Sequence, residues 1–430
     1  MLRKILPAGD LFRNISTLVT GTFLAQLVPM LLQAVLRRIY PEEDFGAFAV
    51  YISVVSIVMI IASLRYEIAV VLPAKKSDAV NLAFVSMFSA IIFNILFLIA
   101  IAVFHSRIMG FLNLQPQYGF VLYMMPLGVL LFSLYQVINY YLVRFKDYKA
   151  VSINKISRRL GEGLFQTTLG IIGKHSSGLI WGNLAGHLVN LASGWWQMLR
   201  HGFSFRLFSW KRQWKLMKQY REFPFYNMIP AFLGAICMHF PVILVSKFYT
   251  QEITAYFDLT RMVLVLPASI LSLSISQVLL QSLSEKFRNK ESIRSDLSRV
   301  MLLLSLLAGG MLLTMLLWAP PLFSLYAGPS YYTSGIYARI LVAGAALKLV
   351  ASPVSSMFVS LGRIKMVSIW QAVYFLLICC LFFFRHLTIE QFLYIYLGID
   401  LLAYGVLLLM ILHISRNYEK DIQNHTPSRT

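Results

Sequence analysis

Long apolar runs follow one another along the whole chain, separated by short polar segments. A run of roughly 20 apolar residues is long enough to cross the hydrocarbon core of a bilayer as a helix. The runs lack the apolar–polar alternation of barrel strands, so each one predicts a helix. We expect about twelve membrane-spanning helices, in residues 15–36, 46–64, 80–104, 118–142, 156–173, 177–199, 223–246, 254–281, 299–321, 335–360, 366–384 and 390–413.

Composition agrees with this pattern. Hydrophobic residues make up 58% of the chain and charged residues 13%, whereas a soluble domain is about half apolar and about a quarter charged. The chain is therefore predicted to be an all-α polytopic membrane protein. Its three cysteines lie in apolar runs without the spacing of a disulfide framework or a zinc site, and we expect no metal and no cofactor.

The basic residues indicate the orientation. A net charge of +20 would favour nucleic acid as the partner of a soluble protein, but cytoplasmic loops of membrane proteins also collect Lys and Arg. With the N-terminus inside, the inner segments hold 29 of the 38 basic residues and the outer loops hold six. Both termini are thus expected in the cytoplasm, and no nucleic-acid partner is predicted.

Two parts of the chain look like copies of each other. Residues 37–45 align with residues 246–254, and a basic turn followed by Val-Ser-Ile recurs at residues 144–153 and 363–369. Two six-span halves in the same orientation predict two six-helix lobes related by a pseudo-two-fold axis along the membrane normal. The expected parts are an N-terminal lobe (1–200), a cytoplasmic amphipathic linker (201–222) and a C-terminal lobe with a cytoplasmic tail (223–430).

The linker has an amphipathic pattern. Trp210 and Trp214 share one helical stripe, and Lys211 and Lys215 lie on the next. This pattern is typical of a helix in the membrane interface that favours anionic lipid, although an ordinary juxtamembrane connection fits as well.

The loops disfavour some functions. Every predicted outer loop is short, whereas a membrane glycan polymerase or ligase acting at the outer face needs a large external loop for its catalytic groups. The chain also lacks a Walker-type Gly-Lys-Ser/Thr loop for ATP. A transporter with this sequence would use an ion gradient or the gradient of its substrate.

Several motifs, taken in order, resemble one family. They are Arg-Ile-Tyr-Pro-Glu-Glu-Asp-Phe-Gly at 38–46, Leu-Arg-Tyr-Glu-Ile-Ala-Val-Val-Leu-Pro at 64–73, Arg-Glu-Phe-Pro at 221–224 and Leu-Gly-Arg-Ile-Lys at 361–365. Over nearly its whole length the chain resembles the Wzx-type polysaccharide flippases of the multidrug/oligosaccharidyl-lipid/polysaccharide exporter superfamily.

The resemblance implies a twelve-helix bundle of two lobes around a central cavity. It implies transport of an undecaprenyl-diphosphate-linked oligosaccharide from the inner to the outer leaflet of a bacterial cytoplasmic membrane, by alternating access, for surface polysaccharides such as the O-antigen of lipopolysaccharide. The lipid-linked oligosaccharide and membrane lipids are then the expected partners, with other polysaccharide assembly proteins as candidates.

Substrate-binding candidates follow from the same resemblance. Related lipid II flippases place arginines of helices one, two and eight in a cationic cavity that faces the diphosphate, and Arg261 in the eighth span matches this pattern. The first two spans have no arginine near their middle; Arg65, at the cytoplasmic end of the second span, is the candidate there. Guanidinium groups bind phosphate oxygens with paired hydrogen bonds, which agrees with this assignment.

Asp258 precedes Arg261 by three positions, so both lie on one helix face. Either the two charges neutralise each other at the outer end of the span, or both face a wet cavity. In the cavity, Arg261 would contact the substrate. Asp258 would modulate the interaction of Arg261 with the substrate or would carry a proton.

Lys348 lies near the middle of the tenth span, and Asp400 lies at a similar depth in the twelfth. A buried membrane charge needs a partner or water, so we expect a Lys348–Asp400 pair. Lys348 is a further substrate-binding candidate, and Asp400 is an ion-coupling candidate.

Two other titratable residues are ion-coupling candidates. Glu162, in the fifth span, has a local salt bridge with Arg158 and Arg159 as its simpler interpretation. His239, in the seventh span, is either a hydrogen-bonded core residue or a proton carrier, as is His187 in the sixth.

Three rival functions remain, of which one, a membrane glycan polymerase or ligase, is disfavoured by the short outer loops. A drug or cation exporter of the same superfamily would need a cavity rich in acidic and aromatic residues. A membrane scaffolding protein of glycan assembly would need no transport site.

Overall fold

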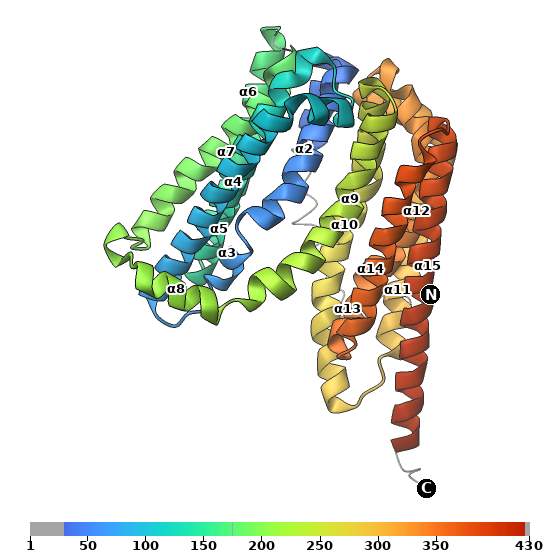
Figure 1. The fold of residues 1–430 in the computed structure, drawn as a ribbon. Helices are drawn as coiled ribbons and strands as arrows, with labels where there is room; N and C mark the ends of the chain where they lie inside the picture. The colour runs from blue at the N-terminus through green and yellow to red at the C-terminus, as the bar shows by residue number, and fades with distance from the viewer. Residues whose placement is uncertain (1–29, 174, 426–430) are drawn as a thin grey trace. The chain divides into compact units, whose positions relative to one another are not determined.

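The computed structural model describes residues 30–173 and 175–425. Within these ranges every regular element is a helix and no strand occurs (Figure 1). This confirms the all-α fold that the apolar runs predict.

Eleven of the twelve predicted spans coincide with long helices. These are α2 (Glu42–Ala62), α4 (Lys76–Leu112), α5 (Gly119–Arg144), α6 (Tyr148–Ile171), α7 (His175–Arg200), α9 (Met228–Phe248), α10 (Gln251–Asn289), α11 (Arg294–Ala327), α12 (Tyr332–Val354), α14 (Ile364–Cys380) and α15 (Ile389–His425). The predicted span 15–36 lies mostly outside the described residues. Its described part, residues 30–36, is helical, and this helix continues to residue 39. Eight of the described helical segments are long and apolar enough to cross a membrane.

The described chain forms two compact units. The first, called here the N-terminal unit, is Val35–Ala255, and the second, the C-terminal unit, contains residues 256–425 with 30–34. The sequence groups α9 with the second lobe, but α9 packs on α2 within the N-terminal unit. Gly46 of α2 lies against the first residue of α10, where a Cβ atom would collide with the Gln251 carbonyl group.

The N-terminal unit also contains the predicted linker helix, α8 (Trp210–Gln219). The hydrophobic core of the N-terminal unit holds buried side chains of α4 and α5, and Leu216 of α8 packs into this core. Trp210 and Trp214 are largely exposed, although the Trp210 ring stacks on Phe88 of α4. Residues Trp210–Gln219 of the predicted linker are thus helical, and the amphipathic interface helix stays a prediction.

Helices α6 and α7 lie side by side in this unit (Figure 1). Gly182 and Gly186 of α7 allow the close approach: a Cβ atom on Gly186 would lie 2.7 Å from the Glu162 Cβ atom, and one on Gly182 would collide with Gln166. Small residues at four-residue spacing commonly bring membrane helices together in this way.

An internal repeat is visible in the turns. The residue that follows the end of α4 is Asn113 (φ 50°), and the one that follows the end of α11 is Gly328 (φ 110°). Each is followed by a short 3₁₀ helix that begins with proline and ends with a buried tyrosine, η2 (Pro116–Tyr118) and η5 (Pro329–Tyr331). This correspondence agrees with the duplicated organisation that the sequence motifs indicate.

Candidate functional site

The predicted Lys348–Asp400 pair is present. The Lys348 Nζ atom lies 2.7 Å from Asp400 Oδ2, and the Asp400 side chain is only 6% exposed. The second carboxylate oxygen accepts a hydrogen bond of 2.8 Å from the Tyr374 hydroxyl group. Since a membrane offers no water to solvate these charges, the ion pair and the hydrogen bond supply the stabilisation that burial removes.

Aromatic rings surround the ammonium group. The Lys348 Nζ atom lies 5.9 Å from the ring centre of Tyr374, 5.5 Å from that of Tyr396 and 5.2 Å from that of Tyr404. These distances are within the range of cation–π attraction. The three tyrosines come from α14 and α15, so three helices, α12, α14 and α15, build the enclosure.

Gly344 explains how α15 approaches α12 so closely. It lies one helical turn before Lys348, and a Cβ atom there would lie 3.1 Å from the Asp400 Cβ atom. A side chain at this position would be in tight contact with Asp400. The glycine therefore allows the close approach of Asp400 to α12.

Arg261 lies beside the same cluster. Its guanidinium carbon is 5.7 Å from the ring centre of Phe257, and that ring is edge-on to Tyr396 with 6.1 Å between the ring centres. Arg261 and Asp258 are both half-buried on α10. The C-terminal unit thus brings together four of the sequence-predicted residues: Asp258, Arg261, Lys348 and Asp400.

Glu162 lies in a second polar cluster, in the N-terminal unit. Its Oε2 atom is 3.7 Å from Arg158 Nη2 and 3.2 Å from Arg159 Nη1, which is the local salt bridge that the spacing predicts. Its other oxygen accepts a hydrogen bond of 2.7 Å from Asn183 Nδ2. Both oxygens of the Glu162 carboxylate therefore have partners, which lie in α6 and α7.

Beside Glu162 lie His187, which the sequence singles out, and Tyr51 and Asn183, which it does not. The Tyr51 hydroxyl group lies 3.5 Å from Asn183 Oδ1. The buried ring of His187 makes a T-shaped contact with the ring of Phe132. Among the described residues the Nδ1 atom of His187 has no hydrogen-bond partner. An asparagine one turn before His187 on α7 is the sequence signal that would have pointed to these neighbours of Glu162.

Arg65 lies in a strained connection between α2 and α4. It adopts φ 61° and ψ 12°, a left-handed conformation that costs a non-glycine residue about 1–2 kcal/mol. Its Nε atom donates a 3.1 Å hydrogen bond to Asn227 Oδ1, at the start of α9. Arg65 therefore links this connection to α9.

Glu67, beside Arg65, is a titratable residue that the sequence did not single out. It is 3% exposed, and its Oε1 atom lies 3.7 Å from Arg65 Nη1. The Oε2 atom has no hydrogen-bond partner among the described residues. Burial raises the pKa of Glu67 above its ordinary value, and a hydrogen bond from Ser63 and the Arg65 charge oppose this only in part.

His239 lies half-buried on α9, and Arg65, Glu162 and His239 all belong to the N-terminal unit. The predicted residues are thus divided between the two units. Within the described ranges, no group of three or more His, Cys, Asp or Glu residues is arranged to hold a metal ion.

A comparison with family models decides the assignment. Residues 35–334 match the model described as "Polysaccharide biosynthesis protein". The chain belongs to the polysaccharide biosynthesis protein family. A search of curated proteins gives no match.

Solved structures show the fold of this family member. An inward-facing multidrug resistance MATE transporter of the MOP superfamily aligns with a TM-score of 0.68 and 15% identity, over 94% of this chain and 95% of the other. The lipid II flippase MurJ in an inward-closed conformation gives 0.71 and 13%, over 94% and 91%. A MOP superfamily transporter from Pyrococcus furiosus gives 0.58 and 14%, over 94% and 95%.

These likenesses establish the two-lobed MOP fold for this chain, and its apolar helices make it a multi-pass membrane protein. The family model and the fold together confirm the resemblance to polysaccharide exporters that the sequence motifs carry.

Proposed function

We propose that the protein is a flippase for undecaprenyl-diphosphate-linked oligosaccharide repeat units. It moves them from the inner to the outer leaflet of a bacterial cytoplasmic membrane by alternating access, with both termini in the cytoplasm. The observation that carries this proposal is the match to the polysaccharide biosynthesis family on a chain with a transporter fold. The fold is shared with a structure named as a lipid II flippase, which supports a lipid-linked cargo.

Arg261 is the proposed contact for the diphosphate. It is half-buried on α10, within an otherwise apolar segment, and lies over an aromatic ring. A guanidinium keeps its charge in such surroundings and presents paired donors to phosphate oxygens. Asp258, one turn earlier, orients Arg261 or shields it when no substrate is bound.

Lys348 and Asp400 are proposed to couple transport to protons. Asp400 holds Lys348 at 2.7 Å, so a phosphate must compete with this carboxylate for the ammonium group. Protonation of Asp400 would remove its negative charge and release Lys348 toward an anionic substrate. Substrate capture and proton uptake are then linked through one ion pair.

A drug or cation exporter is the second candidate, favoured by the likeness to MATE structures and by a carboxylate among tyrosines. An organic cation would need that aromatic enclosure to be vacant. Here Lys348 of the chain itself lies among the three rings. The site geometry therefore favours an anionic cargo over a cationic one.

Cells that lack the protein provide the test. If the proposal is correct, lipid-linked repeat units accumulate in the inner leaflet, surface polysaccharide is lost, and drug sensitivity is unchanged. Arg261→Ala should reproduce this state with a normal protein level, whereas Arg339→Gln, which removes another arginine of a predicted span, should not. Altered drug sensitivity with normal surface polysaccharide would support the exporter, and lipid-linked units that reach the outer leaflet without being polymerised would support a polymerase.

A further inference from the structure

A groove lies between the first turns of α11 and the last turns of α15, where charged residues flank the apolar span of each helix. It has a volume of about 470 Å³, and both apolar and basic side chains line it. The geometry points to a binding site for the headgroup of an anionic phospholipid, such as phosphatidylglycerol, that belongs to the surrounding membrane. The site is separate from the Lys348–Asp400 cluster and does not depend on the proposed transport activity.

The α11 wall of the groove is layered. Met301, Ser298 and Arg294 line it at successive turns of one helix face. The sequence is almost wholly apolar from Val300 onward and polar before it, so this face passes from the hydrocarbon to the headgroup region. Its order from apolar to hydroxyl to basic matches the order of acyl chain, glycerol ester and phosphate in a phospholipid.

The α15 wall repeats this order. Leu412 lies deepest, Ser415 and Arg416 follow one turn later, and Lys420 lies one further turn toward the end of the helix. The two helices therefore present apolar, hydroxyl and basic groups at matching levels. Such basic pockets between membrane helices are typical sites for anionic lipid headgroups.

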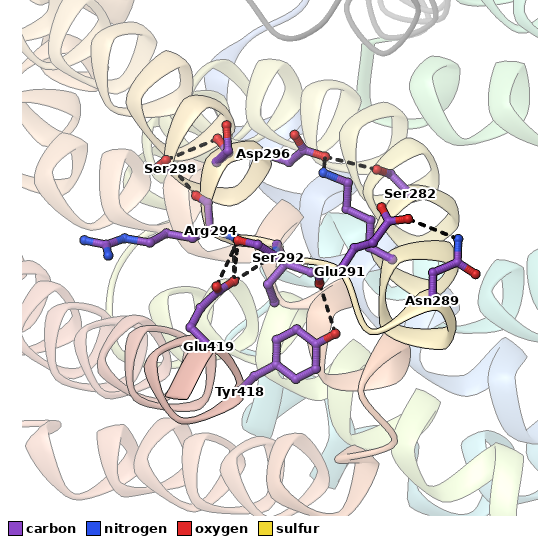
Figure 2. Close-up of polar contacts among 12 residues, drawn as sticks. Ser282, Asn289, Glu291, Ser292, Arg294, Asp296, Ser298, Tyr418 and Glu419 are labelled. Carbon is purple, nitrogen blue, oxygen red and sulfur yellow. Dashed lines mark hydrogen bonds and ion pairs between the residues drawn. The ribbon is translucent and has the colours of Figure 1, made fainter. Parts of the chain in front are cut away.

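The acidic residue of the groove is already engaged. Glu419 Oε1 accepts hydrogen bonds of 2.8 Å from the Ile293 backbone N–H group and 2.9 Å from that of Arg294, and Ser292 donates to the same carboxylate (Figure 2). Glu419 thus caps the first turn of α11, where a negative charge also compensates the helix dipole.

The neighbouring acidic residue is neutralised as well. Asp296 pairs with Lys286 at 2.8 Å (Figure 2). In contrast, no ion pair involves Arg294, Arg416 or Lys420 among the residues that the structure describes. Figure 2 shows the Arg294 side chain extending away from the hydrogen bonds of Glu419. Three exposed cations therefore border the groove, and an anionic ligand would balance them.

The apolar layer distinguishes a lipid from a free anion. Inorganic phosphate would use the three basic groups but would leave the exposed parts of the Met301 and Leu412 side chains uncovered. A phospholipid satisfies both layers because its acyl chains continue into the hydrocarbon beside α11 and α15. Charge complementarity and the level of the groove thus favour the lipid.

Native mass spectrometry of the full-length protein in detergent tests this site. The probes are phosphatidylglycerol and zwitterionic phosphatidylcholine with the same acyl chains, each added in a series of concentrations. We expect tight binding of at least one phosphatidylglycerol and weaker binding of phosphatidylcholine. The triple variant Arg294→Gln, Arg416→Gln, Lys420→Gln should lower phosphatidylglycerol binding about tenfold, since each basic group adds to the attraction.

Two controls keep the result interpretable. The matched variant Lys149→Gln, Arg363→Gln, Lys365→Gln removes three other exposed basic residues and should bind as the wild type does. Met301→Trp, which fills the groove without changing its charge, should weaken phosphatidylglycerol binding even if the triple variant fails to fold. The proposal would be overturned if both lipids bound equally or if inorganic phosphate alone displaced phosphatidylglycerol. It would also be overturned if Met301→Trp, or a folded triple variant, bound phosphatidylglycerol as the wild type does.

Discussion

Lys348 and Asp400 lie 2.7 Å apart, with the carboxylate almost fully buried and held by Tyr374. Removing either charge leaves the other buried without compensation. We therefore expect Lys348→Met or Asp400→Asn to lower the free energy of unfolding by about 3–5 kcal/mol. Thermal unfolding of the purified protein in detergent would measure this loss.

The double variant supplies the control for that experiment. Lys348→Met with Asp400→Asn removes both charges, so it should be clearly more stable than the sum of the single losses predicts. Strictly additive losses would show that the two residues do not depend on each other.

Tyr374 should stabilise the pair through its hydroxyl group. Tyr374→Phe keeps the ring that faces Lys348 but removes the hydrogen bond to Asp400. We expect a loss of about 1–3 kcal/mol in the free energy of unfolding, as for a hydrogen bond to a charged group. Tyr394→Phe, at an exposed position on α15, is the matched control and should have no effect; equal stability of the two variants would contradict the role of the hydroxyl group.

Glu67 should make stability depend on pH. Because burial raises its pKa in the folded protein, the folded state binds more protons than the unfolded state between the ordinary pKa of glutamate and the raised value. Its contribution to stability is therefore fully present below the ordinary pKa and is lost as the pH rises through the raised pKa. Melting temperatures measured from pH 4 to pH 8 should fall across this interval in the wild type.

Glu67→Gln tests the source of that slope. The amide remains neutral over the whole pH range, so the melting temperature of the variant should change less with pH than that of the wild type. The same slope in both proteins would assign the pH dependence to other groups.

Gly46 and Gly110 should respond oppositely to alanine. A Cβ atom on Gly46 would collide with the Gln251 carbonyl group, whereas one on Gly110 of α4 would meet nothing within 4 Å. Gly46→Ala should therefore cost about 1–3 kcal/mol through overpacking of α2 against the start of α10. Gly110→Ala should gain up to about 1 kcal/mol from helix propensity, and a stable Gly46→Ala variant would contradict the close contact.

The sequence predicts the helices well because each span depends on a local property, the length of an apolar run. It also predicts the Lys348–Asp400 pair, because counting residues from the ends of two spans gives the depth of each charge. In the same way, the spacing of Glu162 and its arginines within one helix predicts their salt bridge. The helices and the salt bridge use information contained in single helices. The ion pair uses the depth of each charge in its own helix, and the contact between α12 and α15 completes it.

The missed features depend on which helices become neighbours. Tyrosines are expected mainly at the membrane interfaces, and only the packing of α12, α14 and α15 places Tyr374, Tyr396 and Tyr404 around Lys348. Glu67 becomes buried because the short segment after α2 folds back through the left-handed residues Leu64 and Arg65. The packing of α9 on α2 is likewise a long-range contact that no local pattern encodes.

Translocation by the purified protein in liposomes tests the central claim most directly. The substrate is a fluorescent polyprenyl-diphosphate-linked oligosaccharide, and quenching from outside reports how much of it has crossed. We expect that the wild type moves the lipid, that Arg261→Ala lowers the rate about tenfold or more, that Arg261→Lys, which keeps the charge but loses the paired donors, lowers it less than Arg261→Ala does, and that Arg339→Gln retains most of it. A wild-type protein that leaves the lipid in place, or an Arg261→Ala variant that moves it at the wild-type rate, would contradict the account.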